Sequence, residues 1–391
     1  MKRWLRIGIL LIPLVITGCW DRMEINDIGL VMGTGLDLME DGNIRATLQI
    51  SVPSPSSQTT GVKEGDRFFL ISEVGKNAFD LDQKLQQKMS RTLFFSHRSV
   101  ILIGESLARH GINDILDSFS RHPRNRLKTY VFVVKGMKAG DLLQVHYPYE
   151  LVPAEALKEM QIMRGEGIST TLRDFLIASA SEGINPAVGV LEPTHFFSSS
   201  QKVKDELFRM KGTAIFKSSA LVGFLDNAET HAFLWFKKNK KTDKIVADLP
   251  EGNGNVGYFL TSSEVIIEPD MLGNHLKFHV DIKGKGNLFE NNSRLDVGQP
   301  NNQKLIKKAL ENRVEHDMKV FLRKIQTQYK TDIVGFGQQF QRKDPQKWRI
   351  VEEQWDRHFA AAEISVSVNL TINNTGAIGP SLHLKEKEIM K

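Results

Sequence analysis

Residues 364–372 read Ile-Ser-Val-Ser-Val-Asn-Leu-Thr-Ile, with an apolar residue at every even position and a polar residue at every odd position. Successive side chains of a β-strand point to opposite faces of the sheet, so this alternation predicts a strand with one buried face. A strand of this kind belongs to a sheet that is covered on one side. We expect the covering element to lie nearby in the chain.

The longest predicted helix of the chain is the candidate for that cover. Its apolar stripe consists of Ile306, Leu310, Val314, Met318, Phe321, Ile325 and Tyr329. Residues three and four positions apart share one face of a helix, so the stripe extends over about seven turns. We expect this helix to pack against the strand at 364–372 as helix on sheet.

Predicted strands and helices alternate along the rest of the chain, with strands at 29–38, 44–52 and 130–134 and helices at 113–121 and 172–180. This mixture predicts an α+β or mixed α/β fold with mixed sheets and packed helices. A length of 391 residues exceeds one typical hydrophobic core, so the sequence predicts a multi-domain protein.

We divide the chain into a signal peptide at 1–18, an N-terminal α/β domain at 19–205 and a C-terminal α/β domain at 206–391. The C-terminal domain is expected to have two lobes that are split near residue 300. The boundary between the two domains rests on the polar stretch Ser-Ser-Ser-Gln-Lys at 198–202.

The first eighteen residues are typical of a secretory signal, because basic residues at positions 2, 3 and 6 precede an apolar run at 7–16. An apolar run of roughly ten residues is too short for a membrane-spanning helix, which needs about 20 residues. No second hydrophobic stretch reaches that length. We therefore expect a soluble body with no transmembrane helix in the mature chain.

The apolar run ends in Ile16-Thr17-Gly18-Cys19, which resembles the lipobox of bacterial lipoproteins. This motif predicts cleavage between Gly18 and Cys19, and lipidation of Cys19 by an S-diacylglycerol and an N-acyl chain such as palmitate. Cys19 is the single cysteine of the chain, so an exported protein would otherwise carry an unpaired thiol. Two acyl chains are enough for stable anchoring. The alternative is an incidental cysteine after an ordinary signal peptide.

The formal net charge of +6 falls to +3 once the three basic residues of the signal are removed. A balance this weak gives no reason to expect nucleic acid as a partner, although a mild basic bias suits an anionic membrane surface. The basic run Lys-Lys-Asn-Lys-Lys at 237–241 is interpreted as solvated surface, with contact to a membrane or a partner as the alternative.

Motifs for catalysis and for cofactors are absent from the sequence, which has no P-loop, no Gly-x-Ser-x-Gly elbow and no His-Glu-x-x-His helix. Gly33-Thr34-Gly35 lacks the third glycine and the helix of a dinucleotide fingerprint. His275 and His279 would share a strand face, but no Cys or carboxylate lies at the spacing of a metal site. We predict no catalytic residue, no metal and no cofactor, and hence no enzyme.

A segment rich in glycine and aromatic residues lies near the C-terminus. Gly335-Phe336-Gly337 precedes Asp344 and Pro345, which are typical of a helix N-cap and the first helical position. Trp348, Val351, Trp355, Phe359 and Ala362 follow at helical spacing. Two tryptophans on one stripe could form a ligand cage. Burial against the strand at 364–372 is the favoured interpretation, because each ring can bury about 150–250 Å².

Taken together, these residues resemble the Ger(x)C family of spore germination lipoproteins over nearly the whole chain. The resemblance begins at 18–27, resumes at 211–216 and 221–225, and is densest at 332–337. It continues through Pro345, Trp348, Trp355, Phe359 and Gly376. The family's motif therefore covers Gly335, Gly337 and the aromatic residues that follow. Asn-Asn-Thr at 373–375 departs from the basic residues that the family would have there.

The resemblance implies a C subunit of a nutrient germinant receptor, required for spore germination in response to nutrients. It also implies a lipid-anchored, three-part α/β body on the outer surface of the spore inner membrane, with two integral-membrane partners, the A and B subunits. The main alternative is an extracytoplasmic solute-binding lipoprotein of an importer, which would have two similar lobes and a cleft. A cell-wall hydrolase is a third class, which the lack of a catalytic motif disfavours.

Overall fold

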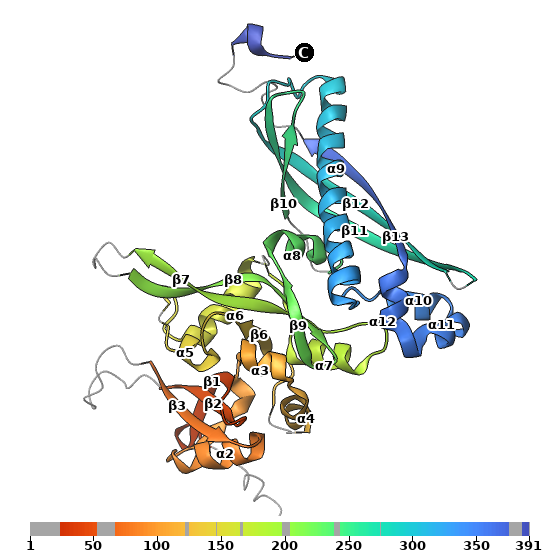
Figure 1. The fold of residues 1–391 in the computed structure, drawn as a ribbon. Helices are drawn as coiled ribbons and strands as arrows, with labels where there is room; N and C mark the ends of the chain where they lie inside the picture. The colour runs from red at the N-terminus through yellow and green to blue at the C-terminus, as the bar shows by residue number, and fades with distance from the viewer. Residues whose placement is uncertain are drawn as a thin grey trace, which may run out of the picture.

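The computed structural model describes residues 24–52, 67–121, 125–145, 147–164, 167–197, 204–237, 243–273, 275–374 and 385–390. Two sheets with packed helices make up this part of the chain (Figure 1). The predicted fold class, α+β with mixed sheets and several domains, is confirmed. Within the described ranges, none of the helices combines the length and the hydropathy that crossing a bilayer requires.

The larger sheet has nine strands in the order β3-β2-β1-β5-β6-β7-β8-β9, with β4 paired to β1. These strands are β1 (Ile28–Leu38), β2 (Ile44–Ser51), β3 (Phe68–Gly75), β4 (Thr92–Phe94), β5 (Val100–Gly104), β6 (Tyr130–Val134), β7 (Ala187–Phe197), β8 (Lys204–Lys217) and β9 (Ala220–Leu225). The central strands β1, β5, β6 and β7 are parallel, whereas β2, β3, β8 and β9 extend the sheet in antiparallel pairs. Parallel strands are usually covered on both faces, which explains the continuous apolar runs of β5 and β6.

Helices cover both faces of the larger sheet. They are α2 (Ala78–Gln87), α3 (Glu105–His110), α4 (Asn113–Arg121), α5 (Ala139–Leu142), α6 (Pro153–Arg164) and α7 (Leu172–Ala180), with a 3-10 turn, η2 (Phe95–His97), before β5. Buried side chains of α2, α3, α4 and α7 share one hydrophobic core with the sheet, and those of α5 and α6 share a second core. The N-terminal part is therefore a layer of strands between two layers of helices.

The second sheet has four strands in the order β10-β11-β12-β13. These strands are β10 (Asp243–Leu249), β11 (Gly254–Leu272), β12 (His275–Asn291) and β13 (Glu363–Asn374). The helical elements around it are α8 (Asn227–Leu234), α9 (Pro300–Arg323), the π-helical turn η3 (Lys324–Tyr329), α10 (Phe336–Lys343), α11 (Pro345–Val351), the 3-10 turn η4 (Glu352–Gln354) and α12 (Trp355–Ala361). Strand β13 returns to pair in parallel with β12.

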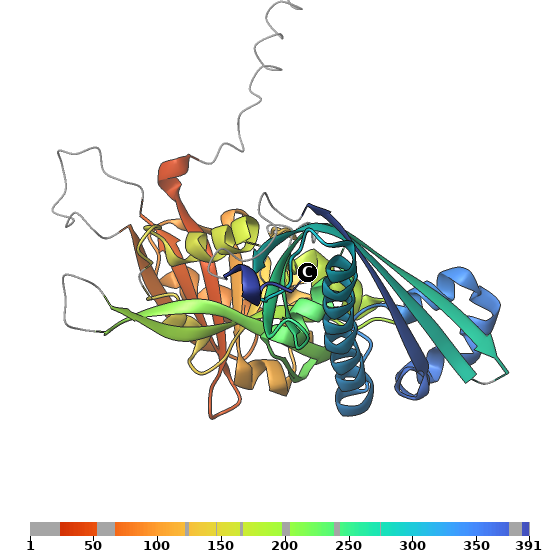
Figure 2. The same cartoon turned by 90° about the horizontal axis from the view of Figure 1, so that it is seen from above.

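The predicted helix-on-sheet packing is confirmed, because α9 lies against β13 and β10 (Figures 1 and 2). Leu370 of β13 is buried, and the other even-numbered apolar residues of that strand pack against the same core. The stripe from Ile306 to Ile325 is buried in this core as well. One hydrophobic face of the sheet is thus covered by the long helix α9 over β10 and β13, and by α10 and α12 over β11 and β12.

The predicted domain boundary at 205/206 falls at the start of β8. Strands β8 and β9 pair within the larger sheet, so residues on both sides of that boundary share one sheet. The division of the chain at 205/206 and near 300 stays a prediction. The polar stretch at 198–202, the residues 238–241 of the basic run and the signal at 1–18 lie outside the described residues.

Candidate functional site at the joint between the two sheets

The predicted motif residues Gly335, Gly337, Trp348, Trp355 and Phe359 gather around one buried carboxylate, that of Asp332. We call this cluster the Asp332 joint and define it by Asp332, Gly335, Gly337, Trp348, Trp355 and Gly183. The sixth motif residue, Pro345, lies apart at the exposed first turn of α11.

The predicted cleavage and lipidation residues, Gly18 and Cys19, lie outside the described residues. The attachment of a lipid to Cys19 therefore stays a prediction.

Asp332 is fully buried and accepts four N–H groups through its carboxylate. Oδ1 accepts from the backbone N–H of Val334 at 3.0 Å and of Gly335 at 2.7 Å. Oδ2 accepts from the backbone N–H of Gly337 at 2.9 Å and from the indole Nε1 of Trp355 at 3.3 Å. These bonds shape the turn between η3 and α10 and tie that turn to α12.

Burial raises the pKa of the Asp332 carboxyl from 3.8 to about 6, because the charged form loses its hydration inside the protein. The backbone N–H groups of Gly337 and Gly335 act in the opposite direction, since they favour the charged form. All four donors are fixed parts of the fold. The Asp332 carboxylate therefore stabilises this turn through its hydrogen bonds.

Two glycines of the motif are needed for geometric reasons. Gly335 has a φ of +98°, in the region that favours glycine, and it caps the start of α10. A Cβ on Gly337 would lie 2.5 Å from the Cα of Gly183 and 2.8 Å from the Trp355 ring. Gly183 belongs to the connection between α7 and β7, so this contact brings the N-terminal part of the chain into the joint.

Trp348 and Trp355 are the two large aromatic residues of the joint, and their rings pack against each other. Their side chains are 2% and 5% exposed, and their ring centroids lie 5.1 Å apart. Trp355 also meets Phe278 of β12 edge-on at 6.3 Å and lies 6.1 Å from Phe359. This burial supports the interpretation of the two tryptophans as core residues.

The expectation of one continuous helix through these tryptophans was wrong. Residues Glu352–Gln354 form the 3-10 turn η4, which separates α11 from α12. The break turns Trp348 and Trp355 toward each other, and it directs α12 to β12 while α9 covers β13. The apolar face of β13 is therefore covered by a different helix from the one that carries the aromatic stripe.

Further contacts fasten the N-terminal part of the chain to the joint. The backbone N–H of Asn185 donates to the backbone carbonyl of Asp332 at 2.6 Å. Lys217, which ends β8, pairs with Asp356 at 2.7 Å. The hydroxyl of Tyr329 donates to the carbonyl of Phe224 at 2.8 Å and accepts from its N–H at 3.2 Å. The joint thus connects the edge of the larger sheet with the helices of the second sheet (Figure 1).

Asp332 and Gly183 were not among the predicted site residues. An Asp followed closely by Gly is typical of a turn in which the carboxylate accepts backbone N–H groups, and this signal could have indicated Asp332. Gly183 lies far from the motif in the sequence, and one sequence alone carries no sign of that pairing.

The other residues weighed for chemistry occupy ordinary structural positions. His279 places Nδ1 at 2.9 Å from the Ser365 hydroxyl and Nε2 at 3.1 Å from the Ser367 hydroxyl on the exposed face of β12. His275 is exposed on the same face. Over the ranges that the structure describes, no group of three or more His, Cys, Asp or Glu side chains could hold a metal ion.

The fold and the Asp332 joint define a class of α+β proteins in which two sheets are linked through a segment, residues 332–355, that carries a buried aspartate, two glycines and two tryptophans. Two family models match the chain. The model described as "Spore germination protein N-terminal domain" matches residues 21–193, and the model described as "Spore germination B3/ GerAC like, C-terminal" matches residues 211–376. The chain belongs to the Ger(x)C family of spore germination proteins.

Individual relatives agree with this assignment. Spore germination protein YndF of Bacillus subtilis (strain 168) is 27% identical over 398 aligned positions, which cover 94% of this chain and 95% of the relative. Spore germination protein KC of the same organism is 24% identical over 392 positions, covering 96% of each. The crystal structure of the GerBC protein matches with a TM-score of 0.58 at 21% identity, over 88% of this chain and 97% of that chain. The last comparison supports the fold.

Proposed function

We propose that this chain is the lipid-anchored C subunit of a nutrient germinant receptor and is required for spores to germinate in response to nutrients. The observation that carries the proposal is the pair of family matches, which together extend from residue 21 to residue 376. The curated relatives, named as spore germination proteins, match along almost their whole length, which supports a shared role.

The anchor of the proposed subunit is the lipidated Cys19, which holds the body on the outer surface of the spore inner membrane. Strand β1 begins at Ile28, nine residues after Cys19. Nine extended residues span at most about 30 Å. A lipid on Cys19 would therefore keep the larger sheet close to the membrane, within reach of integral-membrane A and B subunits.

We propose a non-enzymatic role for this subunit. The Asp332 joint supports that proposal, because its carboxylate is engaged by four N–H donors and its tryptophans are buried. A rigid connection between two sheets suits a protein that transmits or supports a partner's change of state.

The importer alternative expects two similar lobes. Here one described sheet has nine strands with helices on both faces, and the other has four strands with one long covering helix. This difference supports the receptor subunit over the solute-binding protein.

The proposal is tested by affinity purification of the tagged, full-length protein from spore membranes, with the Cys19→Ala variant as the matched control. The expected result is that two integral-membrane proteins accompany the wild-type chain. Recovery of an importer's permease and ATPase in their place would favour the alternative. Deletion of the gene should also abolish or strongly slow germination by at least one nutrient.

A further inference from the structure

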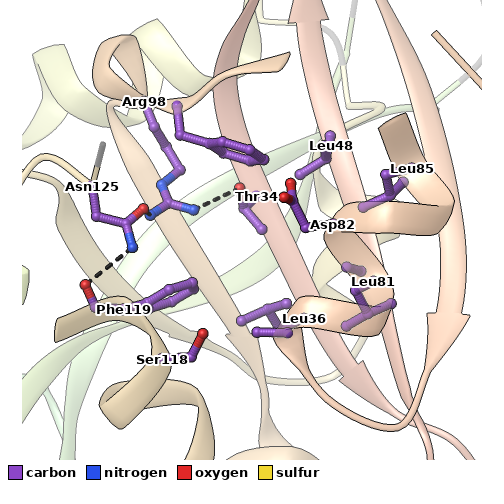
Figure 3. Close-up of a pocket in the computed structure, with 13 residues that line it drawn as sticks. Thr34, Leu36, Leu48, Leu81, Asp82, Leu85, Arg98, Ser118, Phe119 and Asn125 are labelled. Atoms are coloured by element: carbon purple, nitrogen blue, oxygen red, sulfur yellow. Dashed lines mark hydrogen bonds between the residues drawn. The ribbon is translucent and has the colours of Figure 1, made fainter. Parts of the chain in front are cut away.

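A cavity of about 80 Å³ lies in the N-terminal part of the protein, between β1 and β2 on one side and α2 and α4 on the other (Figure 3). A single water needs about 10–15 Å³ of such a cavity, so this one has room for a small organic molecule. We call it the Arg98 pocket and define it by Leu36, Leu48, Leu81, Leu85, Arg98 and Phe119. Most of its walls are apolar.

Arg98 lies at one end of this pocket with its guanidinium held in place. Its side chain is 2% exposed. Nη1 donates to the hydroxyl of Thr34 at 3.3 Å, and Nη2 donates to Oδ1 of Asn125 at 2.8 Å (Figure 3). Asn125 is itself oriented by donating to the backbone carbonyl of Phe119 at 3.0 Å. The guanidinium carbon lies 4.7 Å from the centre of the Phe119 ring, a favourable cation–π contact.

The positive charge of Arg98 has no carboxylate partner in the part of the chain that the structure describes. Its Nε–H is buried without an acceptor, and the two hydrogen bonds above use only two of the five N–H donors of a guanidinium. Burial lowers the pKa of Arg98 to about 10, so the side chain remains charged at neutral pH. A buried charge without a counter-ion is destabilising, which indicates that an anion from solution completes the site.

The walls of the pocket restrict which anion fits. A carboxylate can accept two parallel N–H bonds from one guanidinium, and an apolar body behind it would contact the leucine side chains. Inorganic phosphate has no apolar part to place against those walls. Asp82 also lines the pocket and is half-buried, so it disfavours a second negative charge on the ligand and favours an ammonium group there.

We propose that the Arg98 pocket is a binding site for a small monocarboxylate with a short apolar body, whose carboxylate pairs with the guanidinium of Arg98. Two kinds of molecule supply this chemistry, a short-chain carboxylic acid and an α-amino acid with a small apolar side chain. Only the α-amino acid carries an ammonium group, which would pair with the carboxylate of Asp82. The inference is independent of the receptor role proposed above, because binding is a property of the purified chain.

The test is calorimetric titration of the full-length protein in detergent with butyrate and, separately, with valine. The expected result is saturable binding of one molecule per chain for at least one of the two probes. Arg98→Met should weaken that binding about 10- to 100-fold, since a charged hydrogen-bonded pair is lost. Asp82→Asn should weaken the binding of valine, because the partner of its ammonium group is lost, and should leave the binding of butyrate unchanged or tighter. This difference separates an α-amino acid from a short-chain carboxylic acid as the ligand.

A second variant keeps the test valid if Arg98→Met does not fold. Ser118→Leu leaves the guanidinium in place and fills the pocket from α4, so it should also abolish binding. Ser120→Leu is the matched control, because Ser120 lies on the exposed side of the same helix and outside the pocket. Absence of saturable binding of both probes to the wild-type protein would overturn the proposal. Equal binding by wild type and a folded Ser118→Leu variant would overturn it as well.

Discussion

Gly183 and Gly337 meet backbone to backbone: a methyl group on Gly337 would lie 2.5 Å from the Cα of Gly183, and one on Gly183 would lie 2.8 Å from the backbone of Gly337. The loop before β7 thus packs directly against the turn that leads into α10. It leaves no room for a side chain on either residue, so the joint depends on both glycines.

Gly337→Ala should lower the free energy of unfolding by about 1–3 kcal/mol or more, because neither backbone can move away without breaking the hydrogen bonds of Asp332. Urea denaturation followed by tryptophan fluorescence measures this change. Gly298→Ala is the control, since Gly298 is exposed and a methyl group there would meet only the side chain of Asp296. Equal stability of the two variants would contradict the close contact.

Trp355→Ala should destabilise the protein by about 3–5 kcal/mol, because it removes a buried ring and an N–H donor to Asp332. We expect germination to fail through unfolding of the C-terminal part. Thermal melts of the purified variant check this. A melting temperature equal to that of wild type, together with lost germination, would move Trp355 from the core to a binding surface.

The pH dependence of stability should report on Asp332. The pKa of its carboxyl rises from the ordinary value of 3.8 to about 6 in the folded protein, so between these values the folded state binds more protons than the unfolded state. The free energy of unfolding of wild type, relative to Asp332→Asn, should therefore fall as the pH rises from about 4 to about 6 and stay level above it. Urea titrations across this range measure the difference. If the free energy of unfolding of wild type relative to Asp332→Asn rose over this range, the N–H donors would lower the pKa of Asp332 by more than burial raises it.

Tyr329→Phe should loosen the contact between η3 and β9, because one hydroxyl both donates to and accepts from the backbone of Phe224. The expected loss is about 1–2 kcal/mol, with the two backbone groups of Phe224 left unpaired. Hydrogen exchange at the amide of Phe224 should become faster. Tyr149→Phe serves as the control because Tyr149 is 89% exposed, and it should change neither stability nor exchange.

Cys19→Ala should give an unprocessed or mislocalised protein with strongly impaired germination, since Cys19 is the single cysteine of the chain and ends the lipobox-like stretch at 16–19. Membrane fractionation and mass spectrometry of the N-terminus check the prediction. A variant that is still acylated and as membrane-bound as wild type would refute the assignment of the lipidation site.

The elements that could be predicted from the sequence are those with a strong local pattern. The alternation at 364–372 and the apolar stripe from Ile306 onward predicted the correct strand, the correct helix and their packing. Both patterns are set by a single buried face, so neighbouring residues carry all the information that is needed.

The features that could not be predicted depend on contacts between distant segments. The spacing of Trp348 and Trp355 fits a continuous helix, but their packing on each other and on Phe278 selects the broken form. The pairing of Gly183 with Gly337 and the burial of Arg98 beside Thr34 likewise leave no local pattern. The sequence therefore predicted the motif residues of the candidate site, but not the Asp332 carboxylate around which they lie.

The position of β13 has a consequence for the way in which the chain folds. This strand is the last of the second sheet, and it pairs in parallel with β12 only after α9 to α12 have been made. Until then β12 has an unpaired edge and a hydrophobic face, the kind of surface on which newly made chains aggregate. Contacts between such distant segments also form slowly. A chain that is cut short before Glu363 would keep that edge permanently, so nonsense mutations near the end of the gene should yield insoluble protein as surely as those near its middle.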